Sequence, residues 1–100
     1  MRILGIDPGY AIVGFGVLEY TGTVFTPITY GAITTAAETP FSERLESIYR
    51  DFRLLLQQYQ PDSIAMERLY FTSNQKTVID VAQARGVLML TAQLAQIPVA

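Results

Sequence analysis

Three apolar runs separated by short turns open the chain. The first covers residues 2–7 and ends in an Asp-Pro-Gly turn, and a short apolar run bounded by turn residues is typical of a buried strand. Further runs cover residues 12–20 and 23–35. Because the connections between them are short, we expect these strands to form an antiparallel meander. Pro27 removes a backbone donor from the third strand, so we place that strand at the edge of the sheet.

The next segment has the periodicity of a helix. Apolar residues recur at three- and four-residue spacing over residues 41–59, while the charged residues, Arg44 among them, fall mostly on the other face. Thr39 followed by Pro40 offers a hydroxyl cap and a proline at the first helical position, so we expect Thr39 to cap this helix. The predicted buried stripe consists of Phe41, Leu45, Ile48, Tyr49, Phe52, Leu55, Leu56 and Tyr59.

A second helix and two short strands are predicted after this helix. Residues 63–67 form an apolar run, and a crossover helix before it favours a fourth strand parallel to the first. Asn74 can cap a helix that runs to about Gln96, and residues 97–100 resemble the start of a fifth strand. Small residues in this helix suit close packing against the sheet and a second subunit; they are Ala82, Ala84, Gly86, Ala92 and Ala95.

Two carboxylates close apolar runs, Asp7 after the first strand and Glu67 after the fourth. If these strands are parallel neighbours about 4.8 Å apart, both acids emerge at one carboxyl edge, where α/β proteins gather ligands. Like charges so close need a counter-ion, and hard oxygen ligands favour Mg²⁺, with Mn²⁺ as the expected substitute. Pro8 and Gly9 would shape the turn beside this site. Taken singly, Asp7 is also explained by turn formation and Glu67 by a solvated strand end.

Composition restricts the chemistry further. The chain has 100 residues, the length of one domain with a modest core, and it contains no cysteine and no histidine. Soft-metal sites, thiol nucleophiles and histidine acid–base chemistry are therefore excluded. Nine acids against seven Lys and Arg give a net charge of −2, which argues against coating nucleic acid by bulk charge. No apolar run is long enough to span a membrane, so we expect a soluble, cytoplasmic protein.

Three groups of motifs follow one another in register: Gly5-Ile6-Asp7-Pro8-Gly9 with Gly14-Phe15-Gly16-Val17, Glu67-Arg68-Leu69-Tyr70-Phe71 with Asn74 and Thr77, and Gln83-Ala84-Arg85-Gly86-Val87. Together they resemble the RuvC family of bacterial Holliday-junction resolvases. This resemblance implies a ribonuclease-H-like α/β fold with a mixed sheet, in which strands 1-2-3 are antiparallel and strands 4 and 5 parallel, in the order 3-2-1-4-5, with helices between. Residues 1–100 would then be a single domain that is incomplete at its C-terminus.

The resemblance also implies an activity. Family members are homodimeric crossover junction endodeoxyribonucleases that cleave four-way DNA junctions in recombination and repair, with Mg²⁺ and with the RuvA-RuvB branch-migration complex. They carry four catalytic acids, of which Asp7 and Glu67 match the first two. The other two lie on a C-terminal helix that this chain does not contain. A complete site would hold two ions, so we expect the 100-residue chain itself to cut poorly or not at all.

Candidate DNA contacts follow the fourth strand. Tyr70 matches the position of an aromatic wedge in the family, and Phe71 beside it is a second candidate for stacking on unpaired bases. Arg68, Lys76 and Arg85 are predicted to contact phosphates. Simpler roles remain open, because Phe71 could belong to the core, Lys76 could face solvent and Arg85 could bridge elements of the fold.

Two other functions remain open on sequence grounds. One is a catalytically silent DNA-binding or dimerisation module of the same fold, or a relative such as the YqgF-type nucleases. The other is an actin-like nucleotide-binding domain, because the first motif also resembles the phosphate loop of actin-like ATPases and sugar kinases. That function requires a hydroxyl residue soon after Gly9, and the chain has Tyr10 and Ala11 there.

Overall fold

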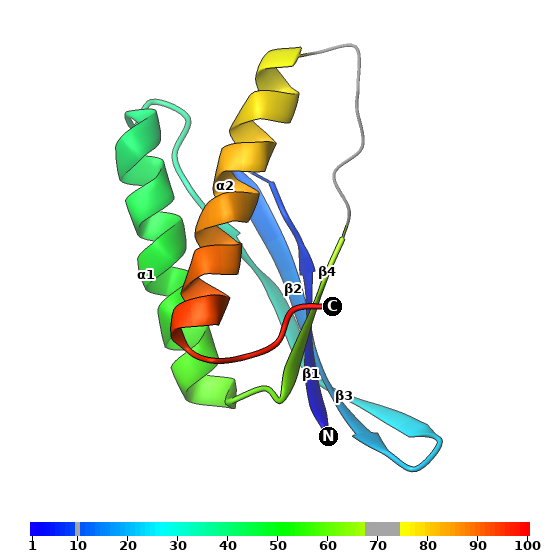
Figure 1. Cartoon of the computed structure of the whole chain (residues 1–100). Helices are drawn as coiled ribbons and strands as arrows, with labels where there is room; N and C mark the ends of the chain where they lie inside the picture. The colour runs from blue at the N-terminus through cyan, green and yellow to red at the C-terminus, as the bar shows by residue number, and fades with distance from the viewer. Residues whose placement is uncertain (10, 68–74) are drawn as a thin grey trace.

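The computed structural model describes residues 1–9, 11–67 and 75–100, without the side chains of residues 75 and 76 (Figure 1). The elements in chain order are β1 (Arg2–Asp7), β2 (Ile12–Thr21), β3 (Val24–Thr34), α1 (Phe41–Tyr59), β4 (Ser63–Met66) and α2 (Gln75–Leu94). Neither helix is long and apolar enough, over the residues described, to cross a membrane.

The four strands form one sheet in the order β3-β2-β1-β4. β2 is antiparallel to both β1 and β3, whereas β4 is parallel to β1, which confirms the predicted meander, the edge position of β3 and the parallel fourth strand. Pro27 lies opposite Leu18, immediately after a register shift between Val17 and Leu18. An edge strand with a bulge tolerates a residue that cannot donate a backbone hydrogen bond.

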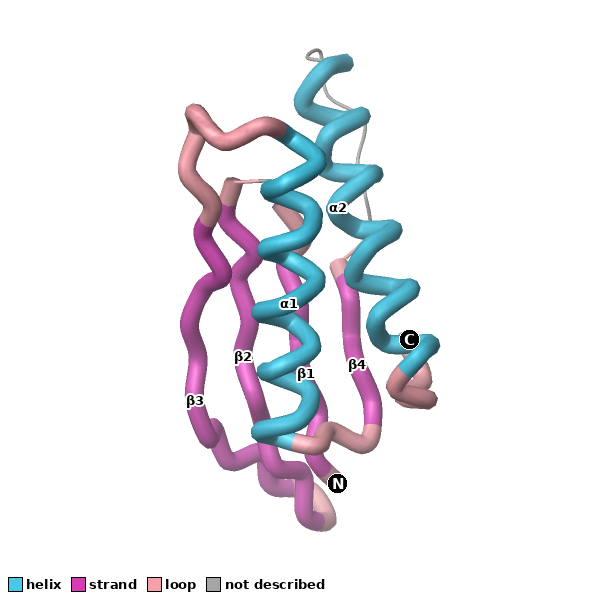
Figure 2. Tube along the Cα trace, turned by 90° about the vertical axis from the view of Figure 1, so that its left-hand side faces the viewer, coloured by secondary structure: helices cyan, strands magenta, loops and turns pink. Residues whose placement is uncertain are grey.

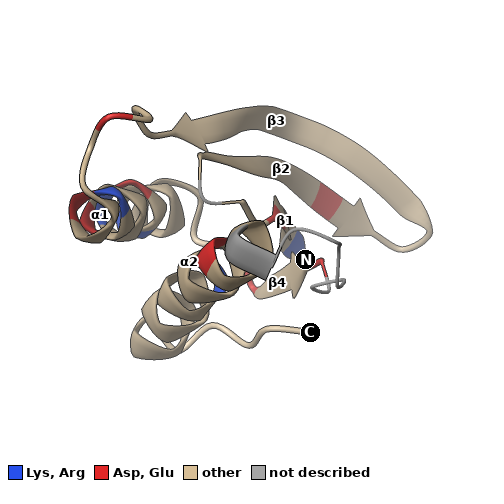
Figure 3. Cartoon of the chain, turned by 90° about the horizontal axis from the view of Figure 1, so that it is seen from above, with Lys and Arg blue, Asp and Glu red and all other residues tan. Residues whose placement is uncertain are grey.

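Both helices cover the same face of the sheet, as Figure 2 shows. Side chains of a strand alternate between the two faces, so every second residue of the strands points toward the helices. In β1 these residues are Leu4 and Ile6, and in β4 they are Ile64 and Met66; all four are buried. Ile48 and Phe52 of α1 pack into the same core and are almost completely inaccessible to solvent. Over the residues described, no helix covers the opposite face of the sheet (Figure 3).

The beginning of α1 corrects two predictions. Pro40, not Thr39, is the N-cap residue, and no side-chain hydrogen bond caps the helix. The first helical bond runs from the Arg44 N–H to the Pro40 carbonyl at 3.0 Å. Arg44 was expected to be exposed but is only 7% exposed, and its Nε donates to the Thr35 hydroxyl at 3.0 Å. The first turn of α1 lies against the segment that leaves β3, so the aliphatic part of Arg44 packs there and its charged end reaches a polar partner.

The C-terminal part agrees with prediction in outline. α2 ends at Leu94, two residues earlier than expected, and Asn74 lies outside the described residues. Val99 forms an isolated parallel bridge with Ile64, and the Ile64 N–H donates to the Pro98 carbonyl at 2.9 Å, so residues 98–100 pair with β4 without completing a fifth strand. Among the small residues expected in this helix, Ala84 and Ala92 are buried against the core, whereas Ala82, Gly86 and Ala95, which follows the end of α2, are exposed.

Candidate metal and nucleic-acid site

Asp7 and Glu67 lie side by side at the carboxyl edge of the sheet. Ile6 and Met66 are register partners in the parallel pair β1 and β4, and the Glu67 N–H donates to the Ile6 carbonyl at 3.0 Å. Because Ile6 and Met66 point toward the helices, the next residue on each strand points to the uncovered face. The two carboxylates therefore share one exposed corner of the molecule, as the sequence predicted.

The two acids influence each other electrostatically. The pKa of Glu67 is raised above its usual range because its carboxyl hydrogen-bonds to Asp7, and because the negative charge of Asp7 and partial desolvation oppose ionisation. A pair of hard oxygen donors that repel each other when ionised suits a divalent cation. Over the residues described, no group of three or more potential ligands forms, so Asp7 and Glu67 are a partial ligand set.

A titration should detect this coupling. We expect the side-chain carboxyl ¹³C signal of Glu67 to titrate at a higher pH than an ordinary glutamate, because protonated Glu67 shares a hydrogen bond with Asp7. Because the pKa of Glu67 is higher in the folded state than in the unfolded state, the stability that its proton contributes is fully present below the unfolded-state pKa. This stability is lost as the pH rises through the folded-state pKa. Asp7→Asn should return Glu67 to the usual range.

Glu19 provides an internal control for this titration. Its pKa is lowered, chiefly by a hydrogen bond from the N-terminal ammonium group of Met1, whose nitrogen lies 2.9 Å from a Glu19 oxygen. Asp7→Asn should leave the Glu19 titration unchanged. A Glu67 midpoint that does not respond to Asp7→Asn would show that the two carboxyls are not coupled.

The turn after β1 gives this corner its shape. A Cβ added at Gly9 would collide with the backbone carbonyl oxygen of Ile12, so the close approach of the two backbone segments requires glycine there. On the other side of Asp7, its register partner is Gly14, and a Cβ on Gly14 would lie 3.6 Å from the Asp7 Cβ. Pro8 and Gly9 carry the chain away from Asp7, whose side chain is exposed.

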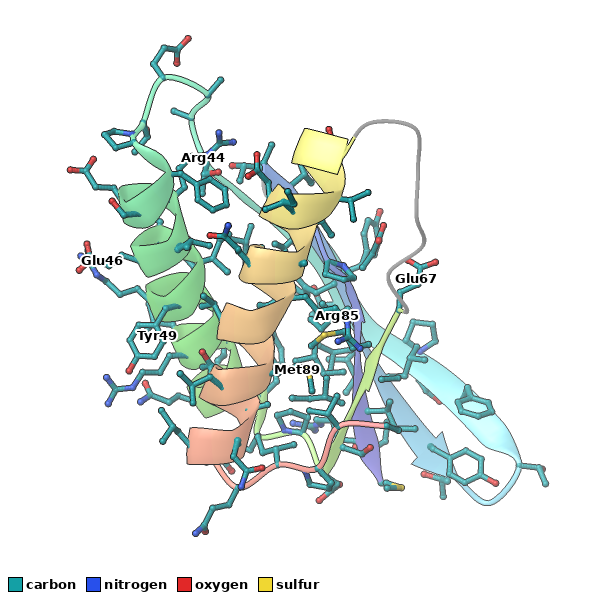
Figure 4. The ribbon with its side chains drawn as sticks, turned by 45° about the horizontal axis from the view of Figure 1, so that its top comes forward. Arg44, Glu46, Tyr49, Glu67, Arg85 and Met89 are labelled. Atoms are coloured by element: carbon teal, nitrogen blue, oxygen red, sulfur yellow. The ribbon has the colours of Figure 1, made fainter. Side chains whose placement is uncertain are left out.

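The predicted DNA contacts are described only in part. Arg68, Tyr70 and Phe71 lie outside the described residues, as does the side chain of Lys76 at the start of α2. Arg85 is half-buried on α2, where its Nη1 donates to the Met89 sulfur at 3.3 Å, while its buried Nε has no hydrogen-bond partner among the described residues. Figure 4 shows Arg85 and Met89 on the flank of α2 toward β1 and β4. Since sulfur is a weak acceptor, this guanidinium keeps strong donor capacity.

A groove that the sequence did not predict lies between the two helices. It has a volume of about 520 Å³ and is lined by residues that include Tyr49, Arg53, Leu56 and Leu94. It lies near the end of α1 that leads into the start of β4, whereas Glu67 follows the other end of that strand. Tyr49 and Leu56 belong to the apolar stripe of α1, so their periodicity indicated only core packing. The groove is not part of the carboxylate site.

Comparison with protein families and curated proteins gives a consistent result. The family model described as "Crossover junction endodeoxyribonuclease RuvC" matches residues 3–100. A relative of that name from Brevibacillus brevis is 50% identical over 99 residues, which are 99% of this chain and 60% of the relative. Another, from Clostridioides difficile, is 52% identical over 90 residues, which are 90% of this chain and 53% of the relative. The chain therefore spans slightly more than half the length of these relatives.

Solved structures agree with the fold. Thermus thermophilus RuvC in complex with a Holliday junction substrate superposes with a TM-score of 0.92 at 27% identity, covering 99% of this chain and 61% of the other. The yeast mitochondrial Holliday junction resolvase matches with a TM-score of 0.73 at 16% identity, covering 97% of this chain and 48% of the other, which shows a shared fold alone. These matches confirm the ribonuclease-H-like sheet expected from the sequence.

Proposed function

The chain belongs to the RuvC family of crossover junction endodeoxyribonucleases, and we propose that it contributes to an enzyme that resolves four-way DNA junctions during recombination and repair. The observation that carries this proposal is the exposed pair formed by Asp7 and Glu67 at the carboxyl edge of the sheet. The family match over residues 3–100 disfavours the nucleotide-binding alternative. The corresponding site of action would be the bacterial cytoplasm.

We propose Mg²⁺ as the resident ion, with Mn²⁺ as a substitute. When bound as a pair, such ions supply a water of lowered pKa and stabilise the charge that develops on the leaving oxygen. Asp7 and Glu67 contribute hard carboxylate oxygens from one corner of the sheet, and the C-terminal acids implied by the family would supply the remaining ligands. Because the described residues hold only a partial ligand set, this chain alone should bind metal weakly.

The DNA would be held by residues that follow β4. Tyr70 and Phe71 are the candidates for stacking on unpaired bases. Arg68, Lys76 and Arg85 are the candidates for phosphate contacts. The free donor capacity of Arg85 beside the Met89 sulfur supports its part in this proposal. A functional connection with a RuvA-RuvB branch-migration complex belongs to the same proposal.

Cleavage of a synthetic four-way junction tests the function. A chimera in which the remaining part of the Brevibacillus brevis relative follows residue 100 would restore the length of the family. We expect it to introduce paired nicks into the junction when Mg²⁺ is present, and to leave a linear duplex of the same sequence uncut. Binding of the junction without cleavage, with either Mg²⁺ or Mn²⁺, would favour the catalytically silent module instead.

The outer face of α2 supports the proposed homodimer. Ile79 and Leu90 are 56% and 59% exposed, and the face between them includes the exposed Gly86. Between Thr77 and Leu94 the only charged residues are Asp80 and Arg85. An exposed apolar surface of this kind is unusual on a monomer and marks an interaction site. A second copy related by a twofold axis would bury the same face on both subunits.

Leu90→Glu should therefore produce a monomer. A carboxylate buried without a partner costs about 3 kcal/mol or more, so the dissociation constant should rise at least about 100-fold. Light scattering coupled to size-exclusion chromatography measures the mass directly. Leu54→Glu is the matched control, because Leu54 is 61% exposed on α1 and should leave the dimer intact. A dimer that persists in Leu90→Glu but not in Leu54→Glu would place the interface elsewhere.

A further inference from the structure

The groove between α1 and α2 combines an apolar floor with a polar rim. Leu56, Pro61 and Thr91 are buried residues of its lining, and the Thr91 hydroxyl donates to the Val87 carbonyl at 2.7 Å. The remaining lining residues are Tyr49, Arg53, Gln57, Gln60, Leu94, Ala95 and Ile97. The volume of about 520 Å³ falls within the range of ligand pockets, about 300–1,000 Å³. The groove is therefore large enough to hold a ligand.

Both helices end beside this groove in an uncommon backbone conformation. Gln60, with φ 46°, ends α1, and its N–H donates to the Leu56 carbonyl at 2.9 Å. Gln96, with φ 60°, lies between the lining residues Ala95 and Ile97. Over the part of the chain that the structure describes, these two are the only residues other than glycine with positive φ. Glycine usually takes this position because other residues are strained there. At Gln60 the strained position keeps an amide side chain in the lining of the groove.

Arg53 gives the rim a positive charge without an acidic partner among the described residues. It takes part in none of the ion pairs that these residues form. None of its neighbours three and four residues away on α1 is acidic; they are Tyr49, Arg50, Leu56 and Gln57. The lining of the groove contains no acid either. Because a guanidinium binds a carboxylate through two parallel hydrogen bonds, the groove favours an acidic group above its apolar floor.

The groove lies at the opposite end of the molecule from the carboxylate site. Gln60 and Pro61 directly precede β4, whereas Glu67 follows it, and α1 and α2 both end on the side where β4 begins (Figure 2). After α2 the chain pairs with β4, and the Met66 N–H donates to the Ala100 carbonyl at 3.5 Å. Residues 98–100 therefore run away from the groove, toward the edge that carries Asp7 and Glu67.

We propose that this groove binds a short segment of a partner protein in which an acidic residue is flanked by apolar residues. The acid pairs with Arg53, the amide of Gln57 bonds to the backbone of the segment, and the apolar residues pack on Leu56 and on Leu94, which is 67% exposed. A nucleic acid is a poorer occupant, because a phosphate backbone is held by several cations and the lining has one.

Such a contact recruits a second protein while the edge with Asp7 and Glu67 stays accessible. A ligand at the opposite end of β4 covers neither carboxylate. The inference does not depend on the proposed function, because it rests on the lining of the groove alone.

A panel of acetylated and amidated pentapeptides tests the proposal in the chimera. Each has aspartate or glutamate at its centre, and leucine, valine or phenylalanine on both sides. In titrations of the ¹⁵N-labelled chimera, the peptides that bind should shift the amide signals of Arg53, Gln57 and Ala95. Replacing the central acid with its amide should weaken binding about 10-fold or more, because a hydrogen bond between charged groups is lost. Arg53→Gln should cause a similar loss.

Two matched controls separate charge from bulk. Arg50→Gln removes an exposed cation of the same helix that is absent from the lining, so it should leave binding unchanged. Ala95→Phe should block the groove, whereas Gln93→Phe adds the same ring at an exposed position of α2 outside the lining and should not.

Four results would overturn the proposal. One is that no peptide of the panel binds at millimolar concentration, and another is equal binding by the Arg53→Gln and Arg50→Gln variants. Displacement of a bound peptide by the four-way junction would assign the groove to DNA. A lower mass of Arg53→Gln in the absence of peptide would assign it to a second copy of the chain.

Discussion

Replacing Asp7 with Asn is expected to lower junction cleavage by the chimera about 10³-fold or more, the size of effect seen when a group that stabilises transition-state charge is removed. The amide keeps the shape of the side chain but removes the negative charge that a divalent ion requires. Asp7 is exposed, and its interaction with Glu67 is made by the carboxyl group. The substitution should therefore leave the fold unaffected. Single-turnover cleavage and a gel-shift assay on the same junction would separate catalysis from binding.

Two further variants make this prediction specific. Glu67→Gln should reduce cleavage by a similar factor, because it removes the other carboxylate of the pair. Asp51→Asn changes another exposed acid, on α1, and should leave cleavage unchanged. Undiminished cleavage by Asp7→Asn would contradict the proposed role of the pair, and equal losses in all three variants would indicate a non-specific effect of charge.

Phe52→Ala should have the largest effect on stability. Phe52 is completely buried between α1 and the sheet, and truncation of such a side chain leaves a cavity that costs about 3–5 kcal/mol. That cost is a large fraction of the whole free energy of unfolding of a small domain, about 5–15 kcal/mol. Urea unfolding followed by circular dichroism should therefore show a midpoint shifted strongly toward lower denaturant.

Leu54→Ala provides the comparison on the same helix. Leu54 is 61% exposed, so its truncation should change the free energy of unfolding by no more than about 0.5 kcal/mol. Similar midpoints for the two variants would mean that the face of α1 that packs on the sheet is wrongly assigned.

Much of the fold follows from local patterns in the sequence. The bounds of α1 were predictable because proline precedes it at Pro40 and follows it at Pro61, and its apolar stripe has a clear period. The parallel position of β4 followed from the crossover rule. The Thr39 cap and the exposure of Arg44 were wrong for one reason: the first turn of α1 packs against the segment after β3, and local sequence does not reveal that contact.

The candidate site was predictable only where it coincides with strand ends. Asp7 and Glu67 each close an apolar run, and the parallel pairing then brings them together. The proximity of Gly5 and Gly16 was not predicted, because they lie on different strands and only the register makes them neighbours. Arg85 shows the same limit, since periodicity cannot indicate that Met89 accepts its hydrogen bond.

Paramagnetic broadening by Mn²⁺ tests the central claim, that Asp7 and Glu67 form part of a divalent metal site. In spectra of the 100-residue chain at substoichiometric Mn²⁺, the amide signals of Asp7, Glu67 and Gly14 should broaden first, since Gly14 lies opposite Asp7. The double variant Asp7→Asn, Glu67→Gln should lose this selective broadening, and Mg²⁺ should compete it away in the unaltered chain. Broadening that centres on other acids, or that persists in the double variant, would contradict the assignment.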